Sequence, residues 1–161
     1  FSAGTIVEDI TQALKNSGLK AESLELELTE SLLLHSSSQI YHDMTQLKEM
    51  GVRLSLDDFG TGYSSLSYLQ RYPFDVLKID RSFVRDLHTD PDNAALTSAV
   101  VVMAHSLGLE VIGEGVEEEV QHQYLQKENC DMLQGFLFSK PLSAKLLAVW
   151  ASEQQSNSTP H

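Results

Sequence analysis

The chain has 161 residues, of which 42% are hydrophobic and 21% charged, a composition that indicates one globular domain with its own core. The formal net charge of −12 excludes broad binding to a nucleic acid polymer, because such binding relies on clustered Lys and Arg. No apolar run approaches the roughly 18 residues of a membrane span, and the one cysteine cannot form an internal disulfide. A cytoplasmic location is therefore expected, including that of a cytoplasmic domain in a membrane-anchored protein.

Short apolar runs alternate with helical patterns along the chain, an order typical of parallel β/α folds. The predicted strands span residues 24–28, 52–57, 76–79, 110–113 and 132–136. The predicted helices span residues 5–17, 38–50, 64–71, 92–107, 117–128 and 143–152. The polar stretch 153–161 is expected to form a flexible tail. The sequence thus predicts about five β/α units over residues 1–152.

Two adjacent carboxylates, Asp57 and Asp58, end the second predicted strand. Like charges side by side repel one another and are costly to desolvate, unless a divalent cation lies between or beside them. A pair of this kind is, by itself, also typical of a solvated turn. The Gly-Thr-Gly sequence that follows at 60–62 predicts a loop over the site.

The other predicted strands also end in polar or charged residues. These are Glu27, Glu30, Lys78, Asp80, Glu114 and Gln134. In parallel β/α barrels the active site forms at the carboxyl ends of the strands. Carboxylates with one lysine and one amide on such a rim suit two hard cations and a phosphate ester.

Five ordered motifs cover most of the chain: ELTES at 27–31, DDFGTGYSSL at 57–66, PFDVLKID at 73–80, GEGVE at 113–117 and QGFLFSKP at 134–141. In these motifs the sequence resembles the EAL-domain family of cyclic di-GMP phosphodiesterases. The resemblance implies a (β/α)8 TIM-like barrel that hydrolyses cyclic di-GMP to linear pGpG. It also implies two Mg2+ or Mn2+ ions as cofactors and inhibition by Ca2+.

The resemblance further implies roles for single residues. It places metal ligands at Glu27, Asp57, Asp58 and Glu114. It places catalytic groups at Lys78, Glu114 and Gln134, with Lys78 positioning or polarising the attacking water.

A loop-stabilising and regulatory group is implied in the same way. It comprises Glu30, Phe59, Gly60, Thr61, Gly62 and Glu117, with Glu30 holding the loop after the aspartate pair. Apart from the resemblance, Glu30 and Glu117 are equally typical of a first helical turn, where the helix dipole favours an acidic side chain.

The Glu-Ala/Val-Leu motif and an upstream Asn of the family are absent, and a complete barrel has about 250 residues. We therefore expect a partial barrel, the C-terminal part of an EAL domain, preceded in its parent protein by a sensor or cyclase domain. The resemblance implies a homodimer. Five strands leave two unpaired edges, which predicts association through the open edges or local reorganisation at residues 24–28 and 132–136. Two functions stay open: a phosphodiesterase, inactive in this fragment alone, or a non-catalytic cyclic di-GMP receptor.

Overall fold

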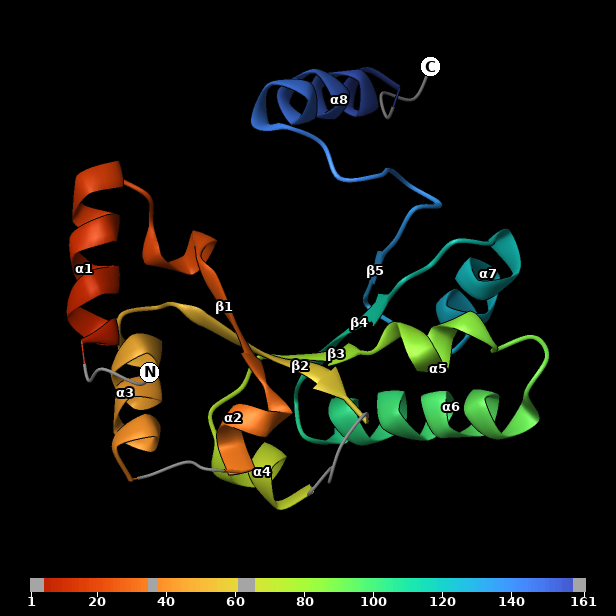
Figure 1. Ribbon diagram of the computed structural model, residues 1–161, viewed down its shortest axis with the longest axis horizontal. Helices are drawn as coiled ribbons and strands as arrows, with labels where there is room; N and C mark the ends of the chain where they lie inside the picture. Colours follow the sequence, from red (N-terminus) through yellow and green to blue (C-terminus); the bar gives the residue numbers. More distant parts are fainter. Residues whose placement is uncertain (1–4, 35–37, 61–65, 158–161) are drawn as a thin grey trace.

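The computed structural model describes residues 5–34, 38–60 and 66–157. Its centre is one open sheet of five parallel strands, whose spatial order follows the chain (Figure 1). The strands are β1 (Glu25–Thr29), β2 (Arg53–Phe59), β3 (Val76–Ile79), β4 (Glu110–Glu114) and β5 (Met132–Gln134). The predicted parallel α/β architecture is confirmed, and all five strands lie where the sequence predicts them.

Six of the helices correspond to predicted ones: α1 (Ile6–Ser17), α3 (Ser38–Glu49), α4 (Leu66–Arg71), α6 (Pro91–Ser106), α7 (Glu119–Lys127) and α8 (Ala144–Asn157). Three short elements were not predicted: η1 (Ala21–Ser23), α2 (Glu30–Leu34) and α5 (Arg81–Arg85). Segments of one turn are too short to show a helical period. Helix α8 continues past the expected end at Ser152, since the Glu and Gln residues that follow are good helix formers.

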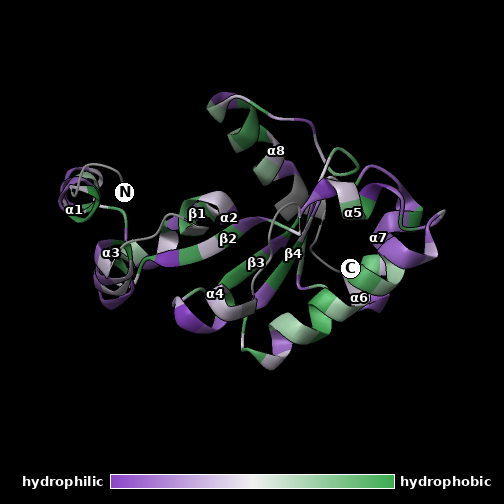
Figure 2. Cartoon of the chain, turned by 60° about the horizontal axis from the view of Figure 1, so that its bottom comes forward, coloured by the Kyte–Doolittle hydropathy of each residue, from purple (hydrophilic) through white to green (hydrophobic). Residues whose placement is uncertain are grey.

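One face of the sheet packs against helices. Because side chains alternate along a strand, Leu54, Leu56, Leu77 and Ile79 share the buried core with residues of α3, α5 and α6. Helices α2, α4 and α6 lie along the same side of the sheet (Figure 1). Figure 2 shows hydrophobic residues along β3 and over much of α6. The opposite face carries Ser55, Asp57 and Lys78 together with the apolar Val76 and Ile112.

The two edge strands differ in length. Strand β1 pairs with β2 over its whole length, from Glu25 to Thr29. Strand β5 ends at Gln134, two residues before the predicted end at residue 136, because the chain turns there to bond with the loop after β4. The Leu137 amide donates to the Val116 carbonyl at 3.0 Å, and the Val116 amide donates to the Gln134 carbonyl at 3.0 Å. Both edge strands keep regular parallel pairing with their single neighbour.

The last helix lies apart from those that cover the sheet. An extended segment leads from β5 to α8, as Figure 1 shows. Leu146, Leu147 and Val149 on this helix are about half exposed. Within the described ranges, no helix is both long and apolar enough to cross a bilayer.

Candidate active site at the carboxyl edge of the sheet

A buried lysine is surrounded by carboxylates on the polar face of the sheet. The Lys78 side chain, on β3, is 4% exposed. Its Nζ lies 2.6 Å from Glu27 Oε1 on β1, 2.7 Å from Glu114 Oε1 on β4 and 3.5 Å from Asp57 Oδ1 on β2. The structure thus brings together four predicted site residues from four successive strands. We call this group the Lys78 cluster.

The pKa values of Lys78 and Glu114 are both raised in the Lys78 cluster, for different reasons. Burial opposes the charge of Lys78, but hydrogen bonds to Glu114 and Glu27 and the charges of Glu114 and Asp57 raise its pKa well above the usual range. Burial also raises the pKa of Glu114, helped by the charges of Asp57 and Glu27 and opposed by Lys78. Lys78 therefore stays a cation at neutral pH, while Glu114 holds a proton more readily than an ordinary glutamate.

The donor set is the kind that hard divalent cations select, because Mg2+ and Mn2+ prefer carboxylate oxygens. In the part of the chain that the structure describes, no three His, Cys, Asp or Glu side chains are arranged around a common metal position. Glu27 and Glu114 instead both contact Nζ of Lys78. By chemistry the residues fit a divalent cation, and the assignment of Glu27, Asp57, Asp58 and Glu114 as its ligands stays a prediction.

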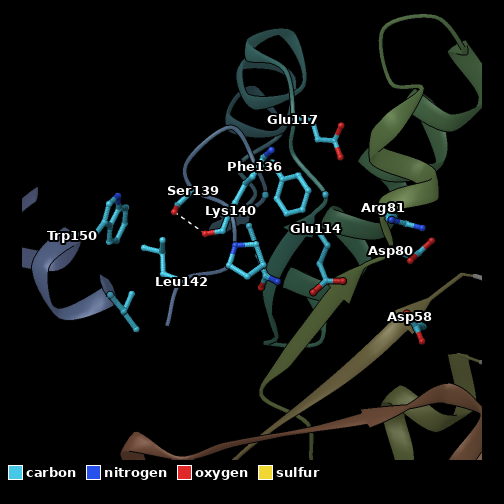
Figure 3. A pocket seen from close by; sticks show the side chains of 15 residues that line it. Asp58, Asp80, Arg81, Glu114, Glu117, Phe136, Ser139, Lys140, Leu142 and Trp150 are labelled. Carbon is cyan, nitrogen blue, oxygen red and sulfur yellow. Dashed lines mark hydrogen bonds between the residues drawn. The ribbon is translucent and has the colours of Figure 1, made fainter. Parts of the chain in front are cut away.

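A cavity of about 610 Å³ opens next to the Lys78 cluster. Four predicted site residues line it: Asp58, Glu114, Glu117 and Gln134. Glu114 belongs to both the cavity and the cluster, so it connects them. Figure 3 shows Glu114 and Phe136 between the side chains of Asp80 and Arg81 on one side and Leu142 and Trp150 on the other.

An irregularity in β2 redirects the second of the two adjacent aspartates, Asp58. The register between β2 and β3 shifts between Leu56 and Phe59, and Asp58 has a φ of 57°. The Asp58 amide donates to Asp57 Oδ1 at 3.0 Å. Consecutive residues of a regular strand point to opposite faces, whereas bulges next to active sites redirect a side chain. The irregular backbone therefore places Asp58 on the cavity wall, while Asp57 lies in the Lys78 cluster.

The residues predicted to hold the loop after β2 are placed in part. Phe59 and Glu30 are buried, and Glu30 begins α2. Gly60 has a φ of 100°, and a Cβ there would lie 2.6 Å from a ring carbon of Phe83 on α5, so the position requires glycine. Thr61 and Gly62 lie outside the described residues. The loop-stabilising roles of these residues stay predictions.

Several cavity residues were not among the predicted site residues: Arg81, Phe136, Ser139, Leu142, Leu147 and Trp150. Two of them could have been found from the sequence: Arg81 directly follows the polar strand end at Asp80, and Phe136 ends the predicted strand that carries Gln134. Leu147 and Trp150 come from α8, and nothing in their local sequence indicates a place beside Glu114.

Parallel β/α units of this kind form part of a TIM-type barrel. In such barrels the active site lies at the carboxyl ends of the strands, where this chain carries its charged side chains. The chain matches the EAL domain family over residues 1–141, and it belongs to that family. The expected fold and family are thereby confirmed.

Three known proteins show how far the likeness extends. The cyclic di-GMP phosphodiesterase NbdA of Pseudomonas aeruginosa is 41% identical over 156 residues, which are 97% of this chain and 20% of NbdA. The structure of the PaMucR phosphodiesterase in complex with c-di-GMP matches with a TM-score of 0.84 and 43% identity, over 89% of this chain and 58% of that one. Klebsiella pneumoniae BlrP1, solved with manganese and cyclic di-GMP, matches with a TM-score of 0.79 and 36% identity, over 84% of this chain and 34% of that one.

Proposed function

We propose that this chain carries the catalytic part of a cyclic di-GMP phosphodiesterase domain. The convergence of Glu27, Asp57 and Glu114 on the buried ammonium of Lys78 is the observation that carries the proposal. NbdA and PaMucR, which are named as phosphodiesterases, support it. The chain spans about a fifth of the length of NbdA, so it is proposed as one segment of a larger signalling protein, with 1–152 as the domain portion.

Each residue of the Lys78 cluster has a chemical task in this proposal. The fixed charge of Lys78 stabilises negative charge that develops on a phosphate oxygen and orients the attacking water. Glu114 presents its carboxyl group at the boundary between cluster and cavity, where the reacting phosphate would lie beside Lys78. Gln134 provides an amide on the same rim.

Divalent cations complete the proposed chemistry. Mg2+ or Mn2+, bound by Glu27, Asp57, Asp58 and Glu114, would supply positive charge that lowers the pKa of the water. BlrP1 has been solved with calcium and with manganese, each together with cyclic di-GMP, which supports a divalent-cation site of this type. Ca2+ is proposed to occupy the site without supporting turnover. We also propose that the chain forms a homodimer and that it lies in the cytoplasm.

Calorimetric titration of cyclic di-GMP into the chain with Ca2+, followed by a Mn2+ hydrolysis assay read by chromatography, tests the proposal. A Lys78→Met variant, shown by circular dichroism to be folded under the assay conditions, serves as the control for turnover. Binding with formation of pGpG, lost in the variant, supports a phosphodiesterase. Binding without product from the wild-type chain, under conditions in which PaMucR is active, leaves a receptor or an enzyme segment that needs the rest of its protein, and the same assay on the longer protein decides between the two. Absence of binding would overturn the proposed function for this chain.

A further inference from the structure

Gln121 of α7 is a buried amide with both ends hydrogen-bonded. The residue is 3% exposed. Its Oε1 accepts from the amides of Glu117 at 2.7 Å and Glu118 at 2.9 Å. Its Nε2 donates to the carbonyl of Arg85 at 3.2 Å, at the end of α5. One side chain therefore connects the loop after β4 with the helix after β3.

The first part of that loop is already held by close backbone contacts. A Cβ on Gly115, which has a φ of 70°, would lie 2.4 Å from Cβ of Arg81. Val116 bonds to Gln134 and Leu137 on the other side. The next residue, Glu117, lines the cavity. Gln121 connects this part of the loop to α5, because it bonds to the Glu117 amide and to the Arg85 carbonyl.

Capping of α7 alone does not account for this arrangement. A side chain that accepts from amides at a helix N-terminus stabilises that helix without any further partner. The bond from Nε2 to Arg85 lies outside the helix, and it joins α7 to the element that carries Arg81 into the cavity. A buried amide with three hydrogen bonds to a loop and a helix end fixes their relative position, because loss of the bond to Arg85, or of both bonds to the loop, leaves a polar end of the buried Gln121 side chain unsatisfied.

We propose that Gln121 is a positioning residue of the site, which fastens loop 115–118 to α5 and so holds Glu117 at the cavity wall. The expected effect of Gln121 on the affinity for cyclic di-GMP rests on the proposed function. Its expected effect on the position of loop 115–118 is independent of that function. Two separate readouts therefore distinguish failure of this inference from failure of the proposed function.

The first readout is amide hydrogen exchange of the whole chain, followed by NMR at about pH 8. Gln121→Ala is expected to speed exchange at the Glu117 and Glu118 amides at least about tenfold and to loosen the amides of α5 as well. Gln121→Glu keeps the acceptor but lacks the amide donor, so it should restore protection at 117 and 118 while α5 stays loosened. Gln123→Ala, on the exposed side of the same helix, should match wild type throughout.

The second readout is the affinity for cyclic di-GMP with Ca2+ in the same variants. Gln121→Ala is expected to weaken it about tenfold, Gln121→Glu less, and Gln123→Ala not at all. Unchanged exchange at 117 and 118 in Gln121→Ala, or wild-type exchange on α5 in both Gln121 variants, overturns the positioning role. If the wild-type chain binds no cyclic di-GMP, the proposed function fails, and the exchange pattern still decides the role of Gln121.

Discussion

Lys78 on β3 contacts Glu27 on β1 across the intervening strand β2, with 2.6 Å between Nζ and Oε1. The register places Glu27 opposite Ser55 on β2 and Ser55 opposite Val76 on β3, so Lys78 lies two residues further along its strand and its side chain reaches back to Glu27. Together with Asp57 and Glu114, three carboxylates face one ammonium. A divalent cation at the predicted ligands would neutralise the surplus of negative charge that remains.

Replacement of Lys78 by methionine should destabilise the chain strongly. The variant leaves three carboxylates facing one another without their cation, and breaking a buried ion pair typically costs about 3–5 kcal/mol. Urea denaturation followed by circular dichroism measures the change. Lys145→Met, at an exposed position of α8, is the control and should lie within about 0.5 kcal/mol of wild type. A loss below about 1 kcal/mol for Lys78→Met would contradict the central role of the ammonium.

Alkaline pH should destabilise the wild-type chain through Lys78. The pKa of Lys78 is raised in the folded chain above its ordinary value of 10.5, so the folded state binds more protons than the unfolded state at high pH. The stabilisation is complete below pH 10.5 and is lost as the pH rises toward the folded pKa. Free energies of unfolding measured from pH 8 upward should fall more steeply for wild type than for Lys78→Met. Parallel curves would show that Lys78 does not carry the dependence.

Divalent cations should stabilise the chain if the predicted ligands bind them. A ligand at about 100 times its Kd adds about 2.7 kcal/mol to the free energy of unfolding. Thermal unfolding with Mn2+, compared with the same sample in EDTA, is the measurement. The double variant Asp57→Asn with Asp58→Asn should lose the shift, since amides bind hard cations less strongly than carboxylates. An equal shift in wild type and double variant would place the bound ion elsewhere.

Alanine at two glycines should have very different effects. At Gly135 a Cβ would lie 2.0 Å from the Val116 carbonyl oxygen, and backbone cannot yield cheaply, so we expect a loss of several kcal/mol, about 3 or more. At Gly113 the nearest atom is Cδ1 of Leu125 at 2.8 Å, the movable end of a side chain, and about 1 kcal/mol is expected. Denaturant midpoints of the two variants provide the comparison. Similar losses at both sites would show that the contact with Val116 relaxes.

Asp80 should stabilise α5 as its N-cap. The Asp80 side chain accepts from the Ser82 amide at 2.9 Å, and loss of such a cap costs about 1 kcal/mol. Asp80→Ala should show this loss in urea denaturation, whereas Asp80→Asn keeps an acceptor oxygen and should stay within a few tenths of a kcal/mol of wild type. A stable alanine variant would mean that packing of Phe83 and Val84 holds α5 without the cap.

The strands were predictable because each one combines a short apolar run with a polar end, and both signals lie within a few residues. Helix α5 was not predicted, since its five residues are shorter than two helical turns. The same limit applies to Gln121. Its sequence position indicates only the N-terminal region of a helix, while its bond to Arg85 joins residues 36 positions apart.

The sequence by itself determined the parallel β/α order, the family and the acidic rim, because these depend on local periodicity and on motifs that are contiguous in the chain. Only the tertiary structure decided that Glu27, Asp57 and Glu114 surround Lys78, while Asp58 and Glu117 line the neighbouring cavity. In a regular strand Asp58 would point to the face opposite Asp57, which is the buried face, and its place at the cavity wall goes with the register shift between β2 and β3 and its φ of 57°. Parallel alignment brings strand ends together from distant parts of the chain, and the irregular backbone then selects which side chain points where.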